Sequence, residues 1–238
     1  MSKEEFGELY LVPVTIAPNT QQQAIPPQVK ERVKALRYFL AEDIRSARRY
    51  LSSLQIFDAI EALRFEVLNK DTPDADLPKL MAPLLQGESV GLLSESGCPG
   101  VADPGSKAVL YAHRHDIHVV PLVGPCSLLL ALMASGLNGQ QFAFHGYLPV
   151  EPQELGAKLK ELERESKQKS QTQIFIETPY RNNYLFEQLK KNLNPKTLLS
   201  VALGLTGEAE FIKTQNVEAW QKNPASWPKE PAVFMFLA

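Results

Sequence analysis

Three loops rich in glycine and proline carry residue types that suit ligand binding. They span residues 13–19, 94–105 and 121–127, and each follows a short apolar run with the character of a strand. Glycine lets a backbone approach a ligand closely, and proline holds a loop in shape before the ligand arrives. Each loop taken singly also fits an ordinary turn. Together, three such loops at strand ends predict a ligand site, and the chain has neither a dinucleotide-binding fingerprint nor a P-loop.

Four carboxylates at or near the ends of expected strands are the candidates for catalysis. Glu42 and Asp43 follow an apolar strand at residues 38–41, Glu95 lies in the second loop, and Glu177 follows a later apolar strand. A carboxylate in such a position can accept a proton as a general base. It can equally cap a helix, accept a ribose hydroxyl or pair with an arginine. The sequence leaves the choice among the four open.

Histidines and cysteines provide no convincing metal site. His113, His115 and His118 have a spacing that could bind a metal, but they straddle a helix end and a strand start, so their side chains should diverge. The two cysteines, Cys98 and Cys126, lack the ligand spacing of a zinc site. We therefore expect no metal, and a reduced thiol at each cysteine.

The charge balance argues against a general attraction to nucleic acid. The net charge is −2 and the isoelectric point is about 6.1, so RNA binding would need a local basic patch. Arg45, Arg48 and Arg49 lie on one expected helix and could contact phosphates. They could equally form a solvated face with Glu42 and Asp43.

The order of elements predicts an α/β fold of two domains. Strands alternate with helices in the first half, which favours a mostly parallel sheet in a domain of residues 1–122. The second half, residues 123–238, ends in strands with few helices between them, which favours a mixed sheet. The expected strands are 9–12, 38–41, 62–68, 90–93, 117–121, 141–145, 174–176, 198–203, 211–213 and 233–237. The expected helices are 27–36, a basic helix after residue 43 that contains Arg45, Arg48 and Arg49, 77–85, 106–115, 126–135, 151–169 and 181–192.

Composition predicts a cytoplasmic protein without a membrane span. Apolar residues make up 44% of the chain and charged residues 22%, which suits a soluble protein with a real core. The N-terminus is acidic and lacks the apolar core of a signal peptide. The most apolar stretch, residues 126–137, is too short to cross a bilayer.

Five segments resemble signature motifs of the tetrapyrrole-methylase superfamily, in order and over nearly the whole chain. Residues 90–105, which contain the second loop, are similar to V-x-L-x-S-D-A-G-x-P-x-x-x-D-P-G, and residues 118–128 are similar to V-x-P-x-P-G-P-[SC]-A. The other matches are A-E-D-T-R at 41–45, F-x-G-F-L-P at 144–149 and I-F-Y-E-S-P-H-R at 174–181. These motifs are typical of the ribosomal-RNA branch, and within it of the 16S ribosomal RNA cytidine 2'-O-methyltransferases.

The resemblance implies a fold, a cofactor and an activity. It implies two α/β domains with S-adenosylmethionine in the cleft between them, a homodimer, and methyl transfer from that cofactor to a ribose 2'-oxygen of ribosomal RNA. Carried over position by position, the residues expected to bind the cofactor are Pro13, Ser94, Ser96, Gly97, Cys98, Val101, Cys126, Ser127 and Glu177.

The chain also departs from the branch pattern. Ala17 and Pro18 replace a glycine in the first loop, and Leu203 and Gly204 replace an arginine and a glutamate. Glu95 replaces an aspartate, and Thr214 replaces a late glycine. These losses keep two alternatives open: a small-molecule, tetrapyrrole-type methylase, and a diverged S-adenosylmethionine-binding protein with little catalysis.

Overall fold

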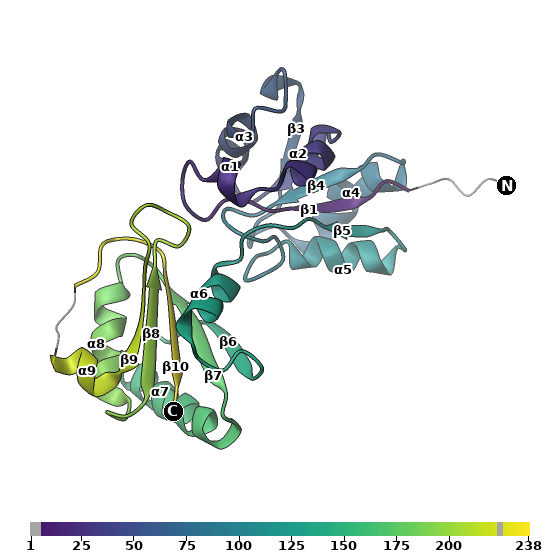
Figure 1. Ribbon diagram of the computed structural model, residues 1–238. Coiled ribbons are helices and arrows are strands. Elements are labelled where there is room, and N and C mark those ends of the chain that lie inside the picture. Colours follow the sequence, from purple (N-terminus) through teal and green to yellow (C-terminus); the bar gives the residue numbers. More distant parts are fainter. Residues whose placement is uncertain (1–5, 223–225) are drawn as a thin grey trace. The chain divides into compact units, whose positions relative to one another are not determined.

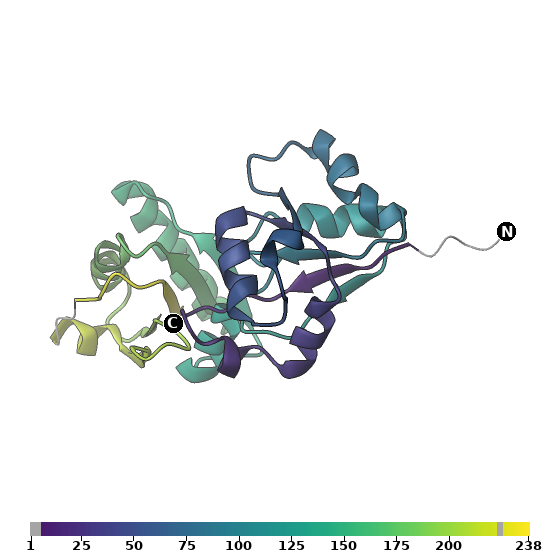
Figure 2. The same cartoon turned by 90° about the horizontal axis from the view of Figure 1, so that it is seen from above.

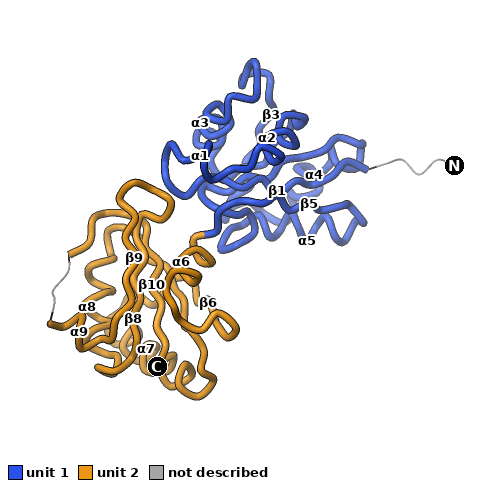
Figure 3. Tube along the Cα trace, in the orientation of Figure 1, with its two compact units in different colours: residues 1–126 blue, residues 127–238 orange. Residues whose placement is uncertain are grey.

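The computed structural model describes residues 6–222 and 226–238 (Figure 1). Contacts within the chain divide it into two compact units, residues 1–126 and 127–238 (Figure 3). The domain boundary expected between residues 122 and 123 stays a prediction, and the two units are described separately below.

The first unit is built on five parallel strands. The strands are β1 (Leu9–Val12), β2 (Tyr38–Ala41), β3 (Arg64–Val67), β4 (Val90–Leu93) and β5 (Val119–Pro121). They pair in the order β3-β2-β4-β1-β5, and every pair is parallel. β2 and β4 are fully buried, as expected for apolar strands covered on both faces.

Helices cover both faces of this sheet (Figure 2). The helices are α1 (Gln21–Ala24), α2 (Pro27–Lys34), α3 (Ile44–Ser53), α4 (Leu77–Leu85) and α5 (Ser106–Arg114), with 3-10 turns η1 (Ile60–Ala62) and η2 (Asp74–Asp76). In β2, Phe39 packs into a cluster with α2 and α3, whereas Leu40 packs into a second cluster with α4 and α5. Successive side chains of a strand point to opposite faces, so the unit has three layers.

The second unit contains a mixed sheet. Its strands are β6 (Phe142–Tyr147), β7 (Thr172–Glu177), β8 (Leu198–Leu203), β9 (Phe211–Asn216) and β10 (Ala232–Leu237). They pair in the order β6-β7-β10-β8-β9; β6 runs parallel to β7, and the other pairs are antiparallel. The fold class expected from the sequence, one mostly parallel and one mixed sheet, is confirmed.

Four helices complete the second unit. They are α6 (Ser127–Ser135), α7 (Pro152–Lys169), α8 (Asn182–Asn192) and α9 (Val217–Lys222). Buried side chains of α7, α8 and α9 form one core with the sheet, and Trp220 and Trp227 both lie in it. α6 packs on β8, β9 and β10.

Two short helices were not expected from the sequence, and three others begin one residue later than expected. α1 falls in the expected polar connection, and α9 falls between the last strands, where few helices were expected. α9 is signalled only by Asn216, whose Oδ1 accepts a hydrogen bond from the Ala219 N–H at 2.8 Å, and by the buried pair Val217 and Trp220. The helix expected from residue 126 begins at Ser127. The helices expected from residues 151 and 181 begin at Pro152 and Asn182.

Within the described part of the chain, no helix combines the length and the apolar character needed to cross a membrane.

Candidate cofactor and catalytic site

The three glycine- and proline-rich loops meet at one edge of the first unit. They follow β1, β4 and β5, which are adjacent in the sheet and parallel, so their carboxyl ends share an edge. The first two loops are joined by an isolated bridge in which the Val14 N–H donates to Gly97 O at 2.8 Å and the Gly97 N–H donates to Val14 O at 3.0 Å. Edges of this kind are where open α/β sheets bind ligands.

The third loop packs against the first one through a glycine. A Cβ atom on Gly124 would overlap the side chain of Pro13. Tyr50 of α3 holds the first loop from the other side, because its hydroxyl donates to Pro13 O at 2.6 Å. Burial raises the pKa of Tyr50, which keeps this donor protonated. Neither Gly124 nor Tyr50 was singled out from the sequence, because no local pattern shows what lies against them.

The second loop contains two glycines with left-handed backbone, of which Gly97 is buried and Gly100 is partly exposed. Gly97 and Gly100 have φ of +73° and +80°, a conformation that side chains other than glycine rarely adopt. A Cβ atom on Gly100 would meet open space, and one on Gly97 would meet only Pro125 O at 3.5 Å. A ligand can therefore approach the backbone of this loop closely at Gly100.

Most of the residues expected to bind the cofactor lie at this edge. Pro13 and Ser94 are buried, Ser96 and Val101 are exposed, and Cys98 and Cys126 are partly exposed. The Ser94 hydroxyl donates to Ser96 O at 3.2 Å, which holds the start of the second loop. The other two expected residues belong to the second unit: Ser127 is the first residue of α6, and Glu177 is the last residue of β7.

Among the four candidate carboxylates, Glu42 has the most unusual surroundings. Burial, followed by a hydrogen bond to the Asp103 carboxyl group and the negative charge of Asp103, raises the pKa of Glu42 to about 7. Within the described residues, Asp103 Oδ2 is buried and has no hydrogen-bond donor. A proton on Glu42 would supply that donor and be shared between the two carboxyl groups.

Asp103 also shapes the second loop. Its Oδ1 accepts hydrogen bonds from the Gly100 N–H at 2.9 Å and from the Gly105 N–H at 2.6 Å. Its carboxyl group also faces Glu42, which follows β2. Asp103 belongs to the motif at residues 90–105, but the sequence alone indicated no role for it.

The remaining carboxylates make different contacts. Asp43 caps α3 by accepting a hydrogen bond from the Ser46 N–H at 2.6 Å, and this bond is the main reason that the pKa of Asp43 is lowered. Glu95 is exposed, and its backbone N–H lies beside the Glu42 carboxyl group. Glu177 is buried; it accepts from the Thr178 N–H at 2.7 Å and pairs with Arg181 at 3.3 Å.

The histidines make separate contacts. His115 stacks on Tyr111 with ring centroids 4.0 Å apart. His118 lies 2.7 Å from the Glu8 carboxylate. Within the described residues, no group of three His, Cys, Asp or Glu side chains could hold a metal ion.

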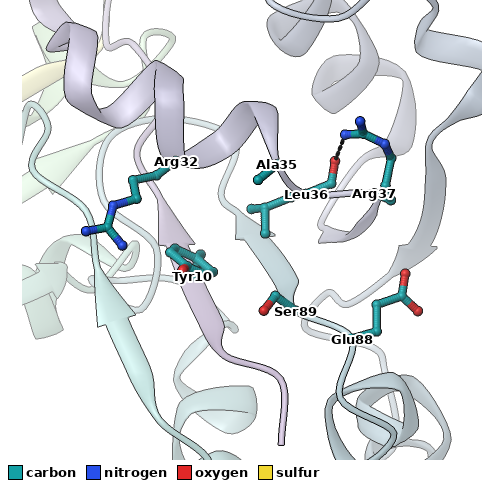
Figure 4. A pocket seen from close by; sticks show the side chains of 7 residues that line it. All are labelled: Tyr10, Arg32, Ala35, Leu36, Arg37, Glu88 and Ser89. Atoms are coloured by element: carbon teal, nitrogen blue, oxygen red, sulfur yellow. Dashed lines mark hydrogen bonds between the residues drawn. The ribbon is translucent and has the colours of Figure 1, made fainter. Parts of the chain in front are cut away.

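A pocket of about 240 Å³ lies elsewhere in the first unit (Figure 4). Its lining residues are Tyr10, Arg32, Ala35, Leu36, Arg37, Glu88 and Ser89. Arg37 precedes β2, and Glu88 and Ser89 precede β4, so this pocket lies at the amino ends of the strands. The three loops lie at the carboxyl ends, so the pocket is separate from them.

Two departures from the branch pattern have a structural explanation. Leu203, in place of an arginine, is buried in the core of the second unit. Gly204, in place of a glutamate, has φ of +56° at the end of β8, and a Cβ atom there would lie 3.3 Å from Ala209 O. The chain therefore turns at Gly204 in a way that disfavours a side chain.

Curated relatives with ribosomal RNA in their names align over most of the chain, whereas no protein-family model matches it. The ribosomal RNA small subunit methyltransferase I of Buchnera aphidicola subsp. Baizongia pistaciae is 27% identical over 98% of this chain and 76% of its own length. The proteins of the same name from Escherichia coli O157:H7 and Vibrio cholerae are 30% and 31% identical, over 87% and 86% of this chain and 68% and 67% of theirs.

Solved structures support the fold independently. A uroporphyrin-III-C-methyltransferase from Thermus thermophilus matches with a TM-score of 0.56 at 19% identity, over 97% of this chain and 92% of its own. The methyltransferase CobJ matches with a TM-score of 0.61 at 16% identity, over 96% and 93%. At these identities the likeness concerns the fold alone.

The contact between the first and third loops makes a prediction about stability. We expect Gly124→Ala to lower the free energy of unfolding by about 1–3 kcal/mol, because the added methyl group overlaps Pro13. Thermal unfolding followed by circular dichroism measures the change. Gly139→Ala is the control, since a Cβ atom there meets open space. Equal melting temperatures for the two variants would contradict the packing of these loops.

Proposed function

The chain belongs to the ribosomal RNA small subunit methyltransferase I family, and from that premise we propose that it transfers a methyl group from S-adenosylmethionine to ribosomal RNA. The observation that carries the proposal is the edge of the first unit where three loops meet. There the backbone of Gly100 is open and donates a hydrogen bond to Asp103, whose carboxyl group faces Glu42.

The residues at this edge fit the proposed cofactor. S-adenosylmethionine carries a positively charged sulfonium, which supplies an activated methyl group when it is bound. The pair of Glu42 and Asp103 keeps one negative charge after sharing a proton, and Glu95 is an exposed carboxylate in the same loop. Opposite charges attract most strongly where water is partly excluded, so this edge favours a cation over an anion.

We assign cofactor binding to the residues that the resemblance indicates. In the first unit these are Pro13, Ser94, Ser96, Gly97, Cys98, Val101 and Cys126, and in the second unit Ser127 and Glu177. The geometry supports the first-unit residues because they lie on loops that meet. Ser127 and Glu177 rest on the resemblance alone.

Glu42 is the best candidate for the general base. A ribose 2'-hydroxyl is a weak nucleophile, and removing its proton during attack on a methyl group lowers the barrier. A base works best when its pKa lies close to the working pH, and the pKa of Glu42 is about 7. The base is the ionised form of Glu42, which becomes the major form as the pH rises above that pKa, and Asp103 is the positioning residue beside it. Asp43 is less suited as a base because it already accepts a hydrogen bond from the N-terminus of α3, and Glu177 is less suited because it is paired with Arg181.

The basic face of α3 is the proposed contact for RNA phosphates. Arg45, Arg48 and Arg49 are all exposed, and α3 begins directly after Glu42 and Asp43. The Arg48 guanidinium lies over the Phe65 ring, 5.2 Å from its centroid. This contact fixes one cation and leaves Arg45 and Arg49 as the exposed pair. Phosphates bound there would bring an RNA strand close to the candidate base.

The proposed partners are ribosomal RNA and a second copy of the chain. A homodimer is implied by the resemblance, and Leu129 and Met133 of α6 expose large apolar side chains that a partner could cover. We propose the cytoplasm as the location, where ribosomal RNA is found.

The first experiment is a titration of the purified chain with S-adenosylmethionine and with S-adenosylhomocysteine by calorimetry. Binding of either molecule is expected, followed by transfer of a radiolabelled methyl group to ribosomal RNA or to small ribosomal subunits. Resistance of the labelled nucleotide to alkaline hydrolysis would identify the 2'-oxygen as acceptor. Binding without transfer would favour the diverged cofactor-binding protein, and no binding at millimolar cofactor would contradict the assigned site.

The shared proton makes a second prediction, for Glu42→Gln. Folding raises the pKa of Glu42 from about 4.5 to about 7. A carboxyl group with a raised pKa stabilises the folded protein at low pH, and this contribution is lost as the pH rises from about 4.5 through about 7. The amide of the introduced glutamine would donate to Asp103 without carrying a charge. We therefore expect the variant to be more stable than the parent at pH 8 by about 1 kcal/mol after solvent screening, or about 2–4 °C in Tm, and equal to it at pH 4.

The same variant tests catalysis. Loss of the general base should lower kcat by about 100-fold or more, while calorimetry still detects the cofactor. Glu61→Gln, an exposed position of the same unit, is the control for both measurements. An unchanged kcat would exclude Glu42 as the base, and an equal difference in Tm between variant and parent at pH 4 and pH 8 would exclude the shared proton.

A third prediction concerns RNA. The double variant Arg45→Ala and Arg49→Ala should bind ribosomal RNA more weakly, and the slope of log K against log salt should flatten by about two, one for each phosphate contact. Filter binding at several salt concentrations measures both quantities. Arg114→Ala on α5, which packs on the opposite face of the sheet, is the matched control. If the control and the double variant behaved alike, α3 would not be the RNA face.

A further inference from the structure

The two cysteines of the chain lie against each other at the proposed cofactor edge. Cys98 belongs to the second loop, and Cys126 lies near the end of the third loop. The Cys98 thiol is hydrogen-bonded to the Cys126 thiol, and its Sγ atom lies 3.4 Å from Pro125 O and 3.9 Å from Gly124 O. Both side chains are partly exposed, and no disulfide joins them.

Backbone contacts, rather than the thiols, hold the two loops together. The bridge between Val14 and Gly97 fixes the second loop one residue before Cys98. Gly124 packs on Pro13 two residues before Cys126. These contacts keep the two sulfur atoms as neighbours whether or not they are bonded.

We propose that Cys98 and Cys126 form a reversible disulfide that links two of the three loops and weakens cofactor binding when it is oxidised. The effect on the cofactor rests on the proposed function; formation of the bond does not. Cys98 directly follows Gly97 in the second loop, so a covalent link to Cys126 restricts the loops that must close around a ligand.

The chemistry is an exchange with a small-molecule disulfide such as oxidised glutathione. One thiolate, that of Cys126, attacks a glutathione sulfur and releases one glutathione thiolate. The Cys98 sulfur then attacks the Cys126 sulfur of the mixed disulfide and releases the second. The two protein thiols lose two electrons and two protons in all, and oxidised glutathione becomes two molecules of reduced glutathione.

The order of attack follows from the surroundings of Cys98. The hydrogen bond to Cys126 and burial raise the pKa of the Cys98 thiol, which favours Cys126 as the first thiol to react. Because the thiolate is the reactive form, oxidation should be faster at pH 8.5 than at pH 7.

The test begins with the full chain incubated with excess oxidised glutathione and then alkylated in denaturant. Since the chain has two cysteines, intact mass should show a fall from two alkyl groups to none, with the mass of a monomer and no glutathione attached. Reductant should restore both labels. Persistent labelling of both cysteines, stable glutathione adducts or dimers linked by a disulfide would each overturn the proposed pair.

Calorimetry on the reduced and oxidised protein then measures the effect on the cofactor. We expect S-adenosylhomocysteine to bind about fivefold or more weakly after oxidation. Saturating S-adenosylhomocysteine should shift the thiol–disulfide equilibrium toward the reduced protein by the same factor, as linkage between the two events requires. The controls are Cys98→Ser and Cys126→Ser, each compared with itself before and after incubation with oxidised glutathione. Once mixed disulfides with glutathione are removed, the affinity of each variant for S-adenosylhomocysteine should be unchanged by the incubation. Equal affinities for the oxidised and reduced parent would overturn the proposed effect. Failure of the reduced parent to bind would count against the proposed function, while the labelling result would still decide the disulfide.

Discussion

Parallel pairing of β4, β1 and β5 is the constraint on which the rest of the first unit depends. Hydrogen bonding between neighbouring parallel strands sets their carboxyl ends at one edge, so the loops that follow must share it. The bridge between Val14 and Gly97 and the packing of Gly124 on Pro13 then turn three loops into one contiguous surface. The contact between the thiols of Cys98 and Cys126 is a direct result, since neither loop alone could form it.

Asp103 couples the shape of this surface to its protonation. One of its oxygens closes the second loop through the Gly100 and Gly105 N–H groups, and its carboxyl group also faces Glu42. After burial, the Asp103 carboxyl group is the largest cause of the raised pKa of Glu42. The residue that holds the loop in place therefore also sets the proton affinity of the candidate base.

The sequence predicts elements well where burial is continuous and poorly where a segment is short or polar. β1, β2, β4, α4 and β8 match the expected bounds because their apolar runs are sharply limited by polar residues or turns. α1 is four residues long with three glutamines, so no apolar periodicity marks it. α9 buries only two side chains, which are too few to show a helical period against the surrounding loop.

For the candidate site, the tendency of open α/β sheets to bind ligands at the carboxyl ends of their strands was enough to indicate the three loops. It could not indicate which of the four carboxylates has the raised pKa. A pKa depends on burial and on partners brought near by folding, and the adjacent Asp43 accordingly has an opposite pKa shift.

The departures from the branch pattern have different structural consequences in the two units. In the second unit, a buried leucine and a glycine with positive φ stand where the pattern has an arginine and a glutamate, and the local backbone is built around them. In the first unit, the loops keep their bridge, their glycines and the Asp103 contacts despite Ala17 and Pro18. Ala17 is buried, and its carbonyl accepts the Thr20 hydroxyl at 2.8 Å, which turns the chain into α1. The departures from the branch pattern thus replace polar groups in the second unit, whereas those at Ala17 and Pro18 leave the three loops of the first unit in contact with one another.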